Sequence, residues 1–322
     1  MWLDILLLAG GIAGVYFGAN WLVDGASSVA RKLKVSSMVI GLTVVAFGTS
    51  APELTVSVIS AVNGNSGIAI GNAVGSNILN ILLILGLSAA IFPMNLQKIT
   101  IWRDIPMSLV AAVVLLFCMN DAWIDGGSAD LISRTEGLIL LCFFAIFLYY
   151  TFTSARHLYQ EDKTIKERKW LASILFIIAG LAALFFGGRF LVDGASSLAI
   201  AAGMSESVVG LTIVAFGTSV PELATSLVAA YRKEHDMAVG NVVGSNVFNI
   251  FFILGTSATI TPMKVSPGSN VDMSLLIAAT LILFVSAFTL GKRRIDRSEG
   301  IVFILIYIAY VAYLIINDSS HA

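Results

Sequence analysis

Charged side chains are scarce in this sequence. Asp, Glu, Lys and Arg make up 12% of its 322 residues, whereas hydrophobic residues make up 57%. A soluble domain carries about 25% charged residues, so this chain cannot cover itself with a soluble surface. Four apolar runs reach the length of a membrane-spanning helix: residues 5–23, 136–152, 170–187 and 299–316. We therefore expect an integral membrane protein in contact with lipid.

Cysteine and histidine are also rare. Cys118 and Cys142 lie in apolar stretches, where we expect them to pack as small hydrophobic residues without a disulfide or metal. The histidines, His157, His235 and His321, fall in loops or the tail. Neither a His-Glu-x-x-His nor a Gly-x-Ser-x-Gly motif occurs. The sequence therefore gives no support to an intramembrane enzyme.

Signatures of nucleotide and nucleic-acid binding are absent as well. The sequence has no phosphate-binding loop and no basic cluster with interleaved aromatic residues. We expect no nucleotide, no nucleic acid and no cofactor, so ion gradients must drive any transport. The first apolar run carries Asp4, lacks a basic leading segment and continues past Trp21. We interpret it as a spanning helix rather than a cleaved signal peptide.

An internal repeat is the clearest feature that is present. GLTVVAFGTSAPELTVS from Gly41 matches GLTIVAFGTSVPELATS from Gly210, and GNAVGSNILNI from Gly71 matches GNVVGSNVFNI from Gly240. The offset of 169 residues holds without a gap over residues 17–94. The two halves must therefore share one local fold.

The apolar pattern predicts ten membrane-spanning helices. Their approximate ranges are 3–29, 36–62, 68–92, 104–120, 134–153, 170–199, 206–230, 237–261, 271–290 and 299–316. Five helices per repeat is an odd number, so the second repeat enters the membrane from the opposite side. The predicted fold class is an all-α polytopic membrane protein with ten transmembrane helices in two inverted five-helix repeats. We expect the first repeat at 1–153, a cytoplasmic linker at 154–169 and the second repeat at 170–322.

The distribution of Lys and Arg predicts the orientation. Sixteen of the 19 lie in alternate loops: Arg31, Lys32, Lys34, Lys98, Arg103, Arg156, Lys163, Lys166, Arg168, Lys169, Arg232, Lys233, Lys292, Arg293, Arg294 and Arg297. The opposite loops hold Arg134 and Lys264, and Arg189 lies within a helix. By the positive-inside rule the basic loops face the cytoplasm, and both termini lie outside.

Two glutamates, Glu53 and Glu222, occupy matching positions in the middle of predicted spans. An acidic side chain at membrane depth costs about 2.5–3.5 kcal/mol on insertion scales, which favours a functional role. The one basic residue inside a predicted helix, Arg189, cannot neutralise two symmetric sites. We interpret both glutamates as ligands of a transported cation.

Further oxygen atoms precede each glutamate. A threonine and a serine stand four and three residues before it, on the same helix face: Thr49 and Ser50, then Thr218 and Ser219. A proline directly before each glutamate frees the backbone carbonyl four residues back. Hydroxyl, carbonyl and carboxylate oxygens suit hard cations such as Ca²⁺ and Na⁺.

The next helix of each repeat carries a polar stripe with a spacing of four. Its members are Asn72, Ser76 and Asn80 in the first repeat, and Asn241, Ser245 and Asn249 in the second. We expect the stripes to face the carboxylates and include Asn80 and Asn249 among the candidate ligands. Glycines in small-xxx-small pairs should permit close helix approach: Gly71, Gly75, Gly240 and Gly244.

Three other polar residues lie in or near predicted helices. Asp24 and Asp193 are paired by the repeat and are expected to act structurally, by capping or ion pairing. Arg189 stands where the first repeat has Asn20, and we expect it to pair locally or to extend toward the membrane surface.

Together, the paired motifs resemble the calcium/cation antiporter superfamily, in its prokaryotic sodium/calcium exchanger branch, over the whole chain. The resemblance implies exchange of Na⁺ for Ca²⁺ in a prokaryotic inner membrane, with the first and sixth helices sliding over a fixed core; we expect a monomer. It implies that Glu53 and Glu222 bind both ions. The implied hydroxyl ligands are Thr49, Ser50, Thr218, Ser219, Ser76 and Ser245, and the carbonyl ligands lie around Ala46 and Ala215.

Asn249 departs from the family pattern, in which Asp is frequent at that position. Asn at both Asn80 and Asn249 also occurs in proton/calcium relatives, so an H⁺/Ca²⁺ antiporter on the same fold is the alternative. It would need a glutamate that takes up and releases a proton in each cycle. A passive channel is a third interpretation, which two inverted halves with central carboxylates disfavour.

The charge distribution generates a labelling prediction. A cysteine placed within Ser154–Lys169, in a chain with Cys118 and Cys142 replaced by alanine, should react with impermeant thiol reagents only from the cytoplasmic face. Intact cells and everted vesicles provide the two faces. A cysteine at Lys264 should show the opposite pattern. Reaction of the linker cysteine from outside would mean that the protein is inserted the other way round.

Overall fold

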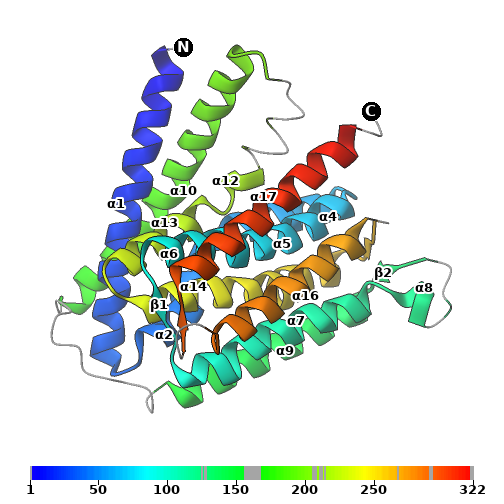
Figure 1. The fold of residues 1–322 in the computed structure, drawn as a ribbon, viewed down its shortest axis with the longest axis horizontal. Helices are drawn as coiled ribbons and strands as arrows, with labels where there is room; N and C mark the ends of the chain where they lie inside the picture. Colours follow the sequence, from blue (N-terminus) through cyan, green and yellow to red (C-terminus); the bar gives the residue numbers. More distant parts are fainter. Residues whose placement is uncertain are drawn as a thin grey trace.

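The computed structural model describes residues 2–124, 126, 129–155, 168–204, 209, 213, 215–266, 268–289 and 293–319. Within these ranges the chain is a helical bundle with four strands of two residues each (Figure 1). The predicted linker lies largely outside the described residues, and so does the beginning of the predicted seventh span, 206–230.

The first half contains the five predicted spans, some of them divided into shorter segments. They are α1 (Trp2–Leu33); α2 (Ser37–Ile40), η1 (Gly41–Val45), α3 (Ala46–Thr49) and α4 (Ala51–Val62); α5 (Ser66–Leu79), η2 (Asn80–Leu85) and α6 (Gly86–Ile91); η3 (Thr100–Asp104) and α7 (Ile105–Cys118); and α9 (Arg134–Ser154). Between them lie β1 (Met94–Asn95), α8 (Asp121–Ile124) and β2 (Leu131–Ile132).

The second half repeats this order. Its helices are α10 (Trp170–Ala201), α12 (Ala215–Gly217), α13 (Val220–Tyr231), α14 (His235–Val247), η5 (Phe248–Leu254), α15 (Gly255–Ile260), α16 (Ser269–Ser286) and α17 (Arg297–Ser319). Its strands are β3 (Met263–Lys264) and β4 (Arg294–Ile295). The segments named η are π-helical turns within longer helices.

The described residues contain eight helices that are long and apolar enough to cross a membrane, or nine if a bent pair counts as one span. Two of them are far more enclosed than the others. In Ser66–Ile91 and His235–Ile260, 72% and 94% of the residues in the most apolar stretch are buried, against 11–44% in the remaining spans. These two repeat-related helices form the centre of the protein, and the others expose more of their apolar side chains.

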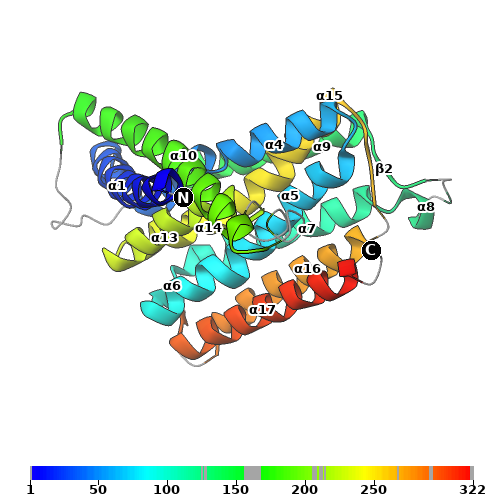
Figure 2. The same cartoon turned by 90° about the horizontal axis from the view of Figure 1, so that it is seen from above.

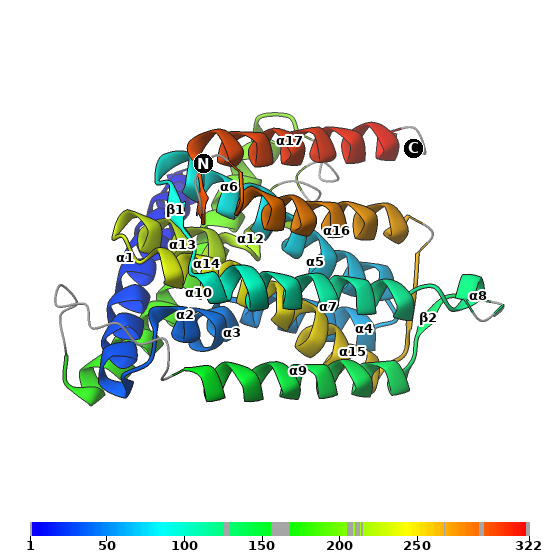
Figure 3. The same ribbon diagram turned by 60° about the horizontal axis from the view of Figure 1, so that its bottom comes forward.

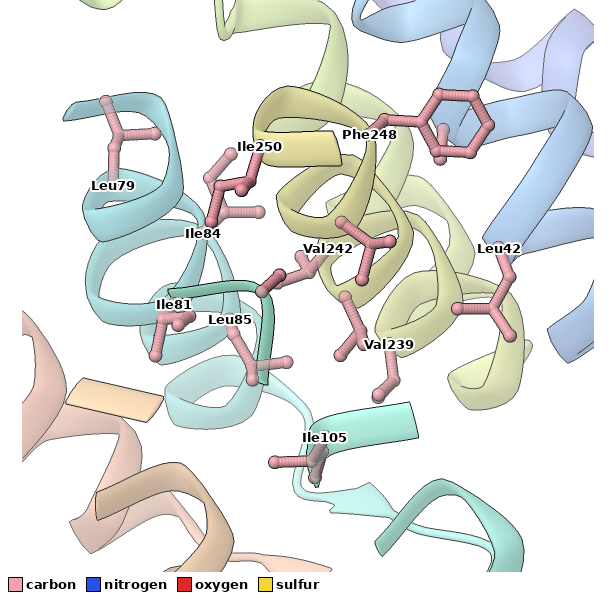
Figure 4. Packing of buried hydrophobic residues seen from close by; sticks show 14 of the residues in the cluster. Leu42, Leu79, Ile81, Ile84, Leu85, Ile105, Val239, Val242, Phe248 and Ile250 are labelled. Atoms are coloured by element: carbon pink, nitrogen blue, oxygen red, sulfur yellow. The ribbon is translucent and has the colours of Figure 1, made fainter. Parts of the chain in front are cut away.

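The apolar core lies around these central helices. Figure 4 shows part of this core, in which Leu79, Ile81 and Leu85 of the first repeat belong to one cluster with Val239 and Val242 of the second repeat. All five side chains are 4% exposed or less. The two halves therefore share one continuous core.

The sequence pattern predicted one continuous span over 36–62. In the structure this second span is broken. Its two parts, Ser37–Thr49 and Ala51–Val62, meet at an angle of 49°. Ser50 sits at the junction with φ −83° and ψ 10°, outside the helical region, and Pro52 lies in the first turn of the next helix. Since proline cannot donate a backbone hydrogen bond and clashes with the preceding turn, the break falls directly beside Glu53.

Short strand pairs connect loops that the charge pattern assigns to the same side. Antiparallel β1 and β4 join the loop after α6 to the loop before α17, and β2 and β3 join the loops that precede α9 and follow α15. The offset of 169 residues relates β1 to β3. The pairs are therefore equivalent features at opposite ends of an inverted-repeat protein.

Helices α1 and α10 stand apart from this arrangement. They lie side by side and steeply inclined to α7, α9, α16 and α17, which run nearly parallel to one another (Figures 1, 2 and 3). Their contact is antiparallel, because Gly11 of α1 meets Leu191 while Gly25 meets Ser173. Glycines recur at intervals of seven in both helices: Gly11, Gly18 and Gly25, then Gly180, Gly187 and Gly194.

A similar close approach occurs at the centre. A Cβ added to Gly240 or Gly244 would lie 2.8 Å from the backbone of Met38 or Leu42, as the small-xxx-small pattern predicted. At Gly71 and Gly75, by contrast, an added Cβ meets no atom of the described residues within 4 Å. The repeat-related partners of Met38 and Leu42, at 207 and 211, lie outside the described ranges.

Two adjacent glycines of α1 allow a matched test of the α1–α10 contact. A Cβ on Gly11 would lie 2.5 Å from the Leu191 backbone nitrogen, whereas one on Gly10 meets nothing within 4 Å. Overpacking costs about 1–3 kcal/mol, so Gly11→Ala should lower the thermal unfolding temperature of the purified protein by several degrees. Gly10→Ala should leave it unchanged or raise it, because alanine is the better helix former. Equal effects of the two changes would contradict the packing described.

Candidate functional site

The two glutamates lie at the start of broken helices in the middle of the protein. Glu53 is in the first turn of α4 and Glu222 is in the first turn of α13, and both side chains are 1% exposed. Ser219 directly precedes α13 with φ −92° and ψ 6°, which repeats the conformation of Ser50 before α4. The repeat therefore builds the same local structure around each carboxylate.

Each carboxylate accepts a hydrogen bond from the other repeat. Ser50 donates to Glu222 Oε1 at 2.9 Å, and Ser219 donates to Glu53 Oε1 at 3.1 Å. The sequence predicted that each serine would share a helix face with its own glutamate. In the structure each serine is the N-cap of the helix that carries its own glutamate, and its hydroxyl bonds to the glutamate of the other repeat.

The serines of the polar stripes complete this crossed arrangement. Ser245 Oγ lies 3.1 Å from Ser50 Oγ, and Ser76 Oγ lies 3.2 Å from Ser219 Oγ. Each hydroxyl pair joins the two repeats. All four serines are at most 6% exposed, so the pairs lie within the protein interior.

Asn72 and Asn241, the first residues of the stripes, hydrogen-bond to the backbone of the glutamates. The Asn72 amide donates to the Glu53 carbonyl oxygen at 3.2 Å and to Ser57 Oγ at 3.0 Å. Asn241 makes the equivalent bonds to the Glu222 carbonyl and Ser226, at 3.3 and 2.9 Å. These asparagines hold the backbone that carries each carboxylate.

Asn80 and Asn249, the last residues of the stripes, contact two asparagines that the sequence pattern had not indicated. Asn80 donates to Asn246 Oδ1 at 3.0 Å, and Asn249 donates to Asn77 Oδ1 at 2.9 Å. Asn77 and Asn246 follow the stripe serines directly and so fall outside a spacing of four. Their appearance in both copies of the GSN motif was the available signal.

Several oxygen atoms of this cluster have no hydrogen-bond partner within the described part of the chain. They are Glu53 Oε2, Glu222 Oε2, Asn80 Oδ1, Asn249 Oδ1 and Thr218 Oγ1. A buried polar atom without a partner costs about 1–3 kcal/mol. A set of such oxygens, two of them on carboxylates, fits the ligand chemistry of Ca²⁺ and Na⁺.

The remaining candidate ligands have different surroundings. Thr49 Oγ1 lies 3.1 Å from Asn241 Oδ1 and 3.1 Å from the Val45 carbonyl oxygen. The Ala46 carbonyl oxygen accepts from the Ser50 backbone nitrogen at 3.0 Å. Ala215 begins α12, and its side chain lies outside the described residues.

A cavity of about 500 Å³ adjoins the break beside Glu53. Thr49, Pro52 and Pro221 line it from the site helices, and Leu181 and Phe185 line it from α10. Helix α10 therefore forms a wall next to the site. Among the described residues, no group of three or more His, Cys, Asp or Glu side chains is placed to hold a metal ion.

The polar residues of α1 and α10 form ion pairs, as the sequence analysis expected. Asp24 pairs with Arg168 at 3.0 Å and also with Arg232, neither of which the sequence had suggested as its partner. Arg189 pairs locally with Asp193 at 3.8 Å, and both side chains are more than half exposed. These residues make none of the hydrogen bonds that join the carboxylate, hydroxyl and amide oxygens around Glu53 and Glu222.

An inverted repeat with carboxylates at broken helices near its centre defines a secondary transporter. Comparison with known proteins agrees with this class. The family described as sodium/calcium exchanger protein matches residues 3–153 and again residues 172–316. The chain therefore belongs to the sodium/calcium exchanger family, in the prokaryotic branch of the calcium/cation antiporter superfamily.

Relatives match over nearly the full length. The chain is 37% identical to a putative antiporter, CaxA, of Alkalimonas amylolytica, over 96% of this chain and 97% of the relative. It is 31% identical to the sodium/calcium exchanger MaX1 of Methanosarcina acetivorans, over 97% of this chain and 98% of the relative.

A solved structure of the sodium-calcium exchanger NCX_Mj, soaked with 10 mM Na⁺ and zero Ca²⁺, superposes with a TM-score of 0.83. It is 35% identical in sequence, and the match covers 96% of this chain and 98% of that one. These findings confirm the predicted fold class and the resemblance, and they assign the chain to the cation/calcium antiporters.

Proposed function

We propose that this protein exchanges Na⁺ for Ca²⁺ across a prokaryotic inner membrane by alternating access. Glu53 and Glu222 bind the ions in turn. Hydroxyl and amide oxygens of both repeats complete the coordination, at Thr49, Ser50, Ser76, Asn80, Thr218, Ser219, Ser245 and Asn249. The carbonyls around Ala46 and Ala215 are the remaining candidates.

The observation that carries this proposal is the crossed pairing of the two repeats around the glutamates. Ser50 donates to Glu222 and Ser219 donates to Glu53, and the second oxygen of each carboxylate remains without a partner in the described residues. Each carboxylate is held by one oxygen and presents the other. Such an arrangement supports a ligand role for both glutamates in one shared site.

Charge balance supports coupled exchange. Two ionised carboxylates carry a charge of −2, which one Ca²⁺ or two Na⁺ would neutralise. A third Na⁺ would leave one positive charge in a region of low dielectric constant, where it is costly. Competition of Ca²⁺ and Na⁺ for the same oxygens is a sufficient mechanism for exchange. The names of MaX1 and NCX_Mj as sodium/calcium exchangers favour Na⁺ as the counter-ion.

The same proposal includes the membrane arrangement. The basic loops face the cytoplasm, both termini lie outside, and residues 154–169 link the repeats at 1–153 and 170–322. Helices α1 and α10 move together across the central helices to open the site to either side. Their close mutual packing and their steep inclination to the other spans support movement as a pair.

Charge removal at the site provides the first functional test. Glu53→Gln and Glu222→Gln keep the shape of the side chain but remove half of the charge that offsets Ca²⁺. Each should abolish Na⁺-dependent ⁴⁵Ca²⁺ uptake into proteoliposomes, while elution profile and thermal unfolding remain close to those of the unchanged protein. Asp193→Asn, which removes a half-exposed charge outside the oxygen cluster, is the matched control and should retain transport. Normal exchange in both glutamine variants would eliminate the proposed site.

The counter-ion needs gradients that are imposed separately. An outward Na⁺ gradient at equal pH should drive ⁴⁵Ca²⁺ uptake, and a pH gradient without Na⁺ should not. Uptake driven by the pH gradient alone would identify the H⁺/Ca²⁺ antiporter instead. Calcium entry that needs neither gradient and stops when Ca²⁺ has equilibrated across the membrane would indicate a passive channel.

A further inference from the structure

Four asparagines cross the centre of the protein in two matched pairs. Asn77 and Asn80 come from the first repeat, and Asn246 and Asn249 occupy the equivalent positions in the second. All four are at most 1% exposed. Asn80 begins the π-helical turn η2, and Asn249 lies at the start of η5. Such turns are frequent at functional sites because they redirect side chains.

The orientation of the Asn77 amide follows from its partner. Its nitrogen lies 3.1 Å from the backbone carbonyl oxygen of Asn246. A carbonyl oxygen can only accept a hydrogen bond, so the NH₂ group of Asn77 must point at it. The oxygen of the same amide then faces the other way, where it accepts from Asn249 at 2.9 Å.

The chain of donors and acceptors continues to the site. Because the NH₂ group of Asn249 is bound to Asn77, the Asn249 oxygen is the free end of its amide, and it has no partner in the described residues. The second repeat gives the same result. Asn246 donates to the Asn77 carbonyl at 3.4 Å and accepts from Asn80 at 3.0 Å, which leaves the Asn80 oxygen without a partner.

We infer that Asn77 and Asn246 are positioning residues that make Asn249 and Asn80 present an oxygen, and not an NH₂ group, to the cation. The inference rests on the proposed cation site and deepens it. An asparagine amide has nearly equal shape in its two orientations, but only one offers an oxygen ligand. The backbone carbonyls of Asn77 and Asn246 select that orientation through a relay of two hydrogen bonds.

The relay also crosses between the repeats. Asn77 orients Asn249, and Asn246 orients Asn80, although each is nearer in sequence to the other ligand. A general structural role would weaken both ligands alike. The proposed role instead predicts coupling in the crossed pairs alone, which double-mutant cycles measure directly.

The experiment uses the full-length protein in detergent and measures equilibrium ⁴⁵Ca²⁺ binding. Single alanine variants are made at Asn77, Asn80, Asn246 and Asn249, together with the four double variants that combine one positioning residue with one ligand. Loss of a partner that orients a metal ligand typically lowers affinity 10- to 100-fold, so each single variant should weaken binding by about ten-fold or more.

In the crossed cycles the second change should add little. Once Asn249 is alanine, Asn77→Ala should weaken Ca²⁺ binding by less than about two-fold, and the same holds for Asn246→Ala in the Asn80→Ala protein. In the uncrossed cycles, Asn77 with Asn80 and Asn246 with Asn249, the effects should multiply. Multiplying effects in the crossed cycles, or equal coupling in all four, would overturn the inference.

Two further measurements separate a wrong relay from an unfolded variant and from a wrong cation site. Thermal unfolding checks that each variant is folded, and Asn77→Ser and Asn246→Ser replace any alanine variant that is not, since serine is too short to reach both partners. Glu53→Gln is measured alongside. If Ca²⁺ binding survives Glu53→Gln, the proposed site is wrong; if Glu53→Gln removes it while the crossed cycles multiply, the relay alone is wrong.

Discussion

The structure depends on the burial of two carboxylates that have no basic partner among the described residues. Glu53 and Glu222 are almost fully buried, and the hydrogen-bond donors to them within the described residues are serine hydroxyls of the opposite repeat. Removing a carboxylate from water is costly unless it is paired and hydrogen-bonded. Because each repeat supplies the donor for the glutamate of the other, neither half can satisfy its own charge, and the two must interlock.

The dependence of each repeat on the other explains which helices lie at the centre of the protein. The carboxylates, their donors and the nearby oxygens lie on the broken second span, at the break between α12 and α13, and on the two most enclosed spans, Ser66–Ile91 and His235–Ile260. Glycines at 240 and 244 bring the second of these within backbone contact of the first repeat, so that short side chains such as Ser50 and Ser245 can meet. Helices α1 and α10 contact each other through their own glycines and contribute none of the hydrogen bonds to the carboxylates among the described residues.

Much of this was predictable from the sequence. The ungapped repeat, its odd number of spans and the two acidic residues at membrane depth predicted the fold class and the place of Glu53 and Glu222. The crossed pairing was not predictable, because the spacing of residues along one helix does not show how the two repeats are placed against each other. Asn77 and Asn246 were missed because each directly follows a stripe serine, in regular helix before the π-helical turn, and so falls outside the spacing of four on which the stripes were drawn.

The two repeats have matching contacts at the centre of the protein but differ in the polar contacts of α1 and α10. Asp24 and Asn20 of the first repeat both contact Arg232, which follows α13. In the second repeat, Arg189 replaces Asn20 and pairs with Asp193 on its own helix. For a carrier that alternates between two access states, identical halves would give those states equal free energy. The contact of α1 with Arg232 has no equivalent at α10 among the described residues, so the two halves differ in contacts outside the carboxylate site although the residues within that site match.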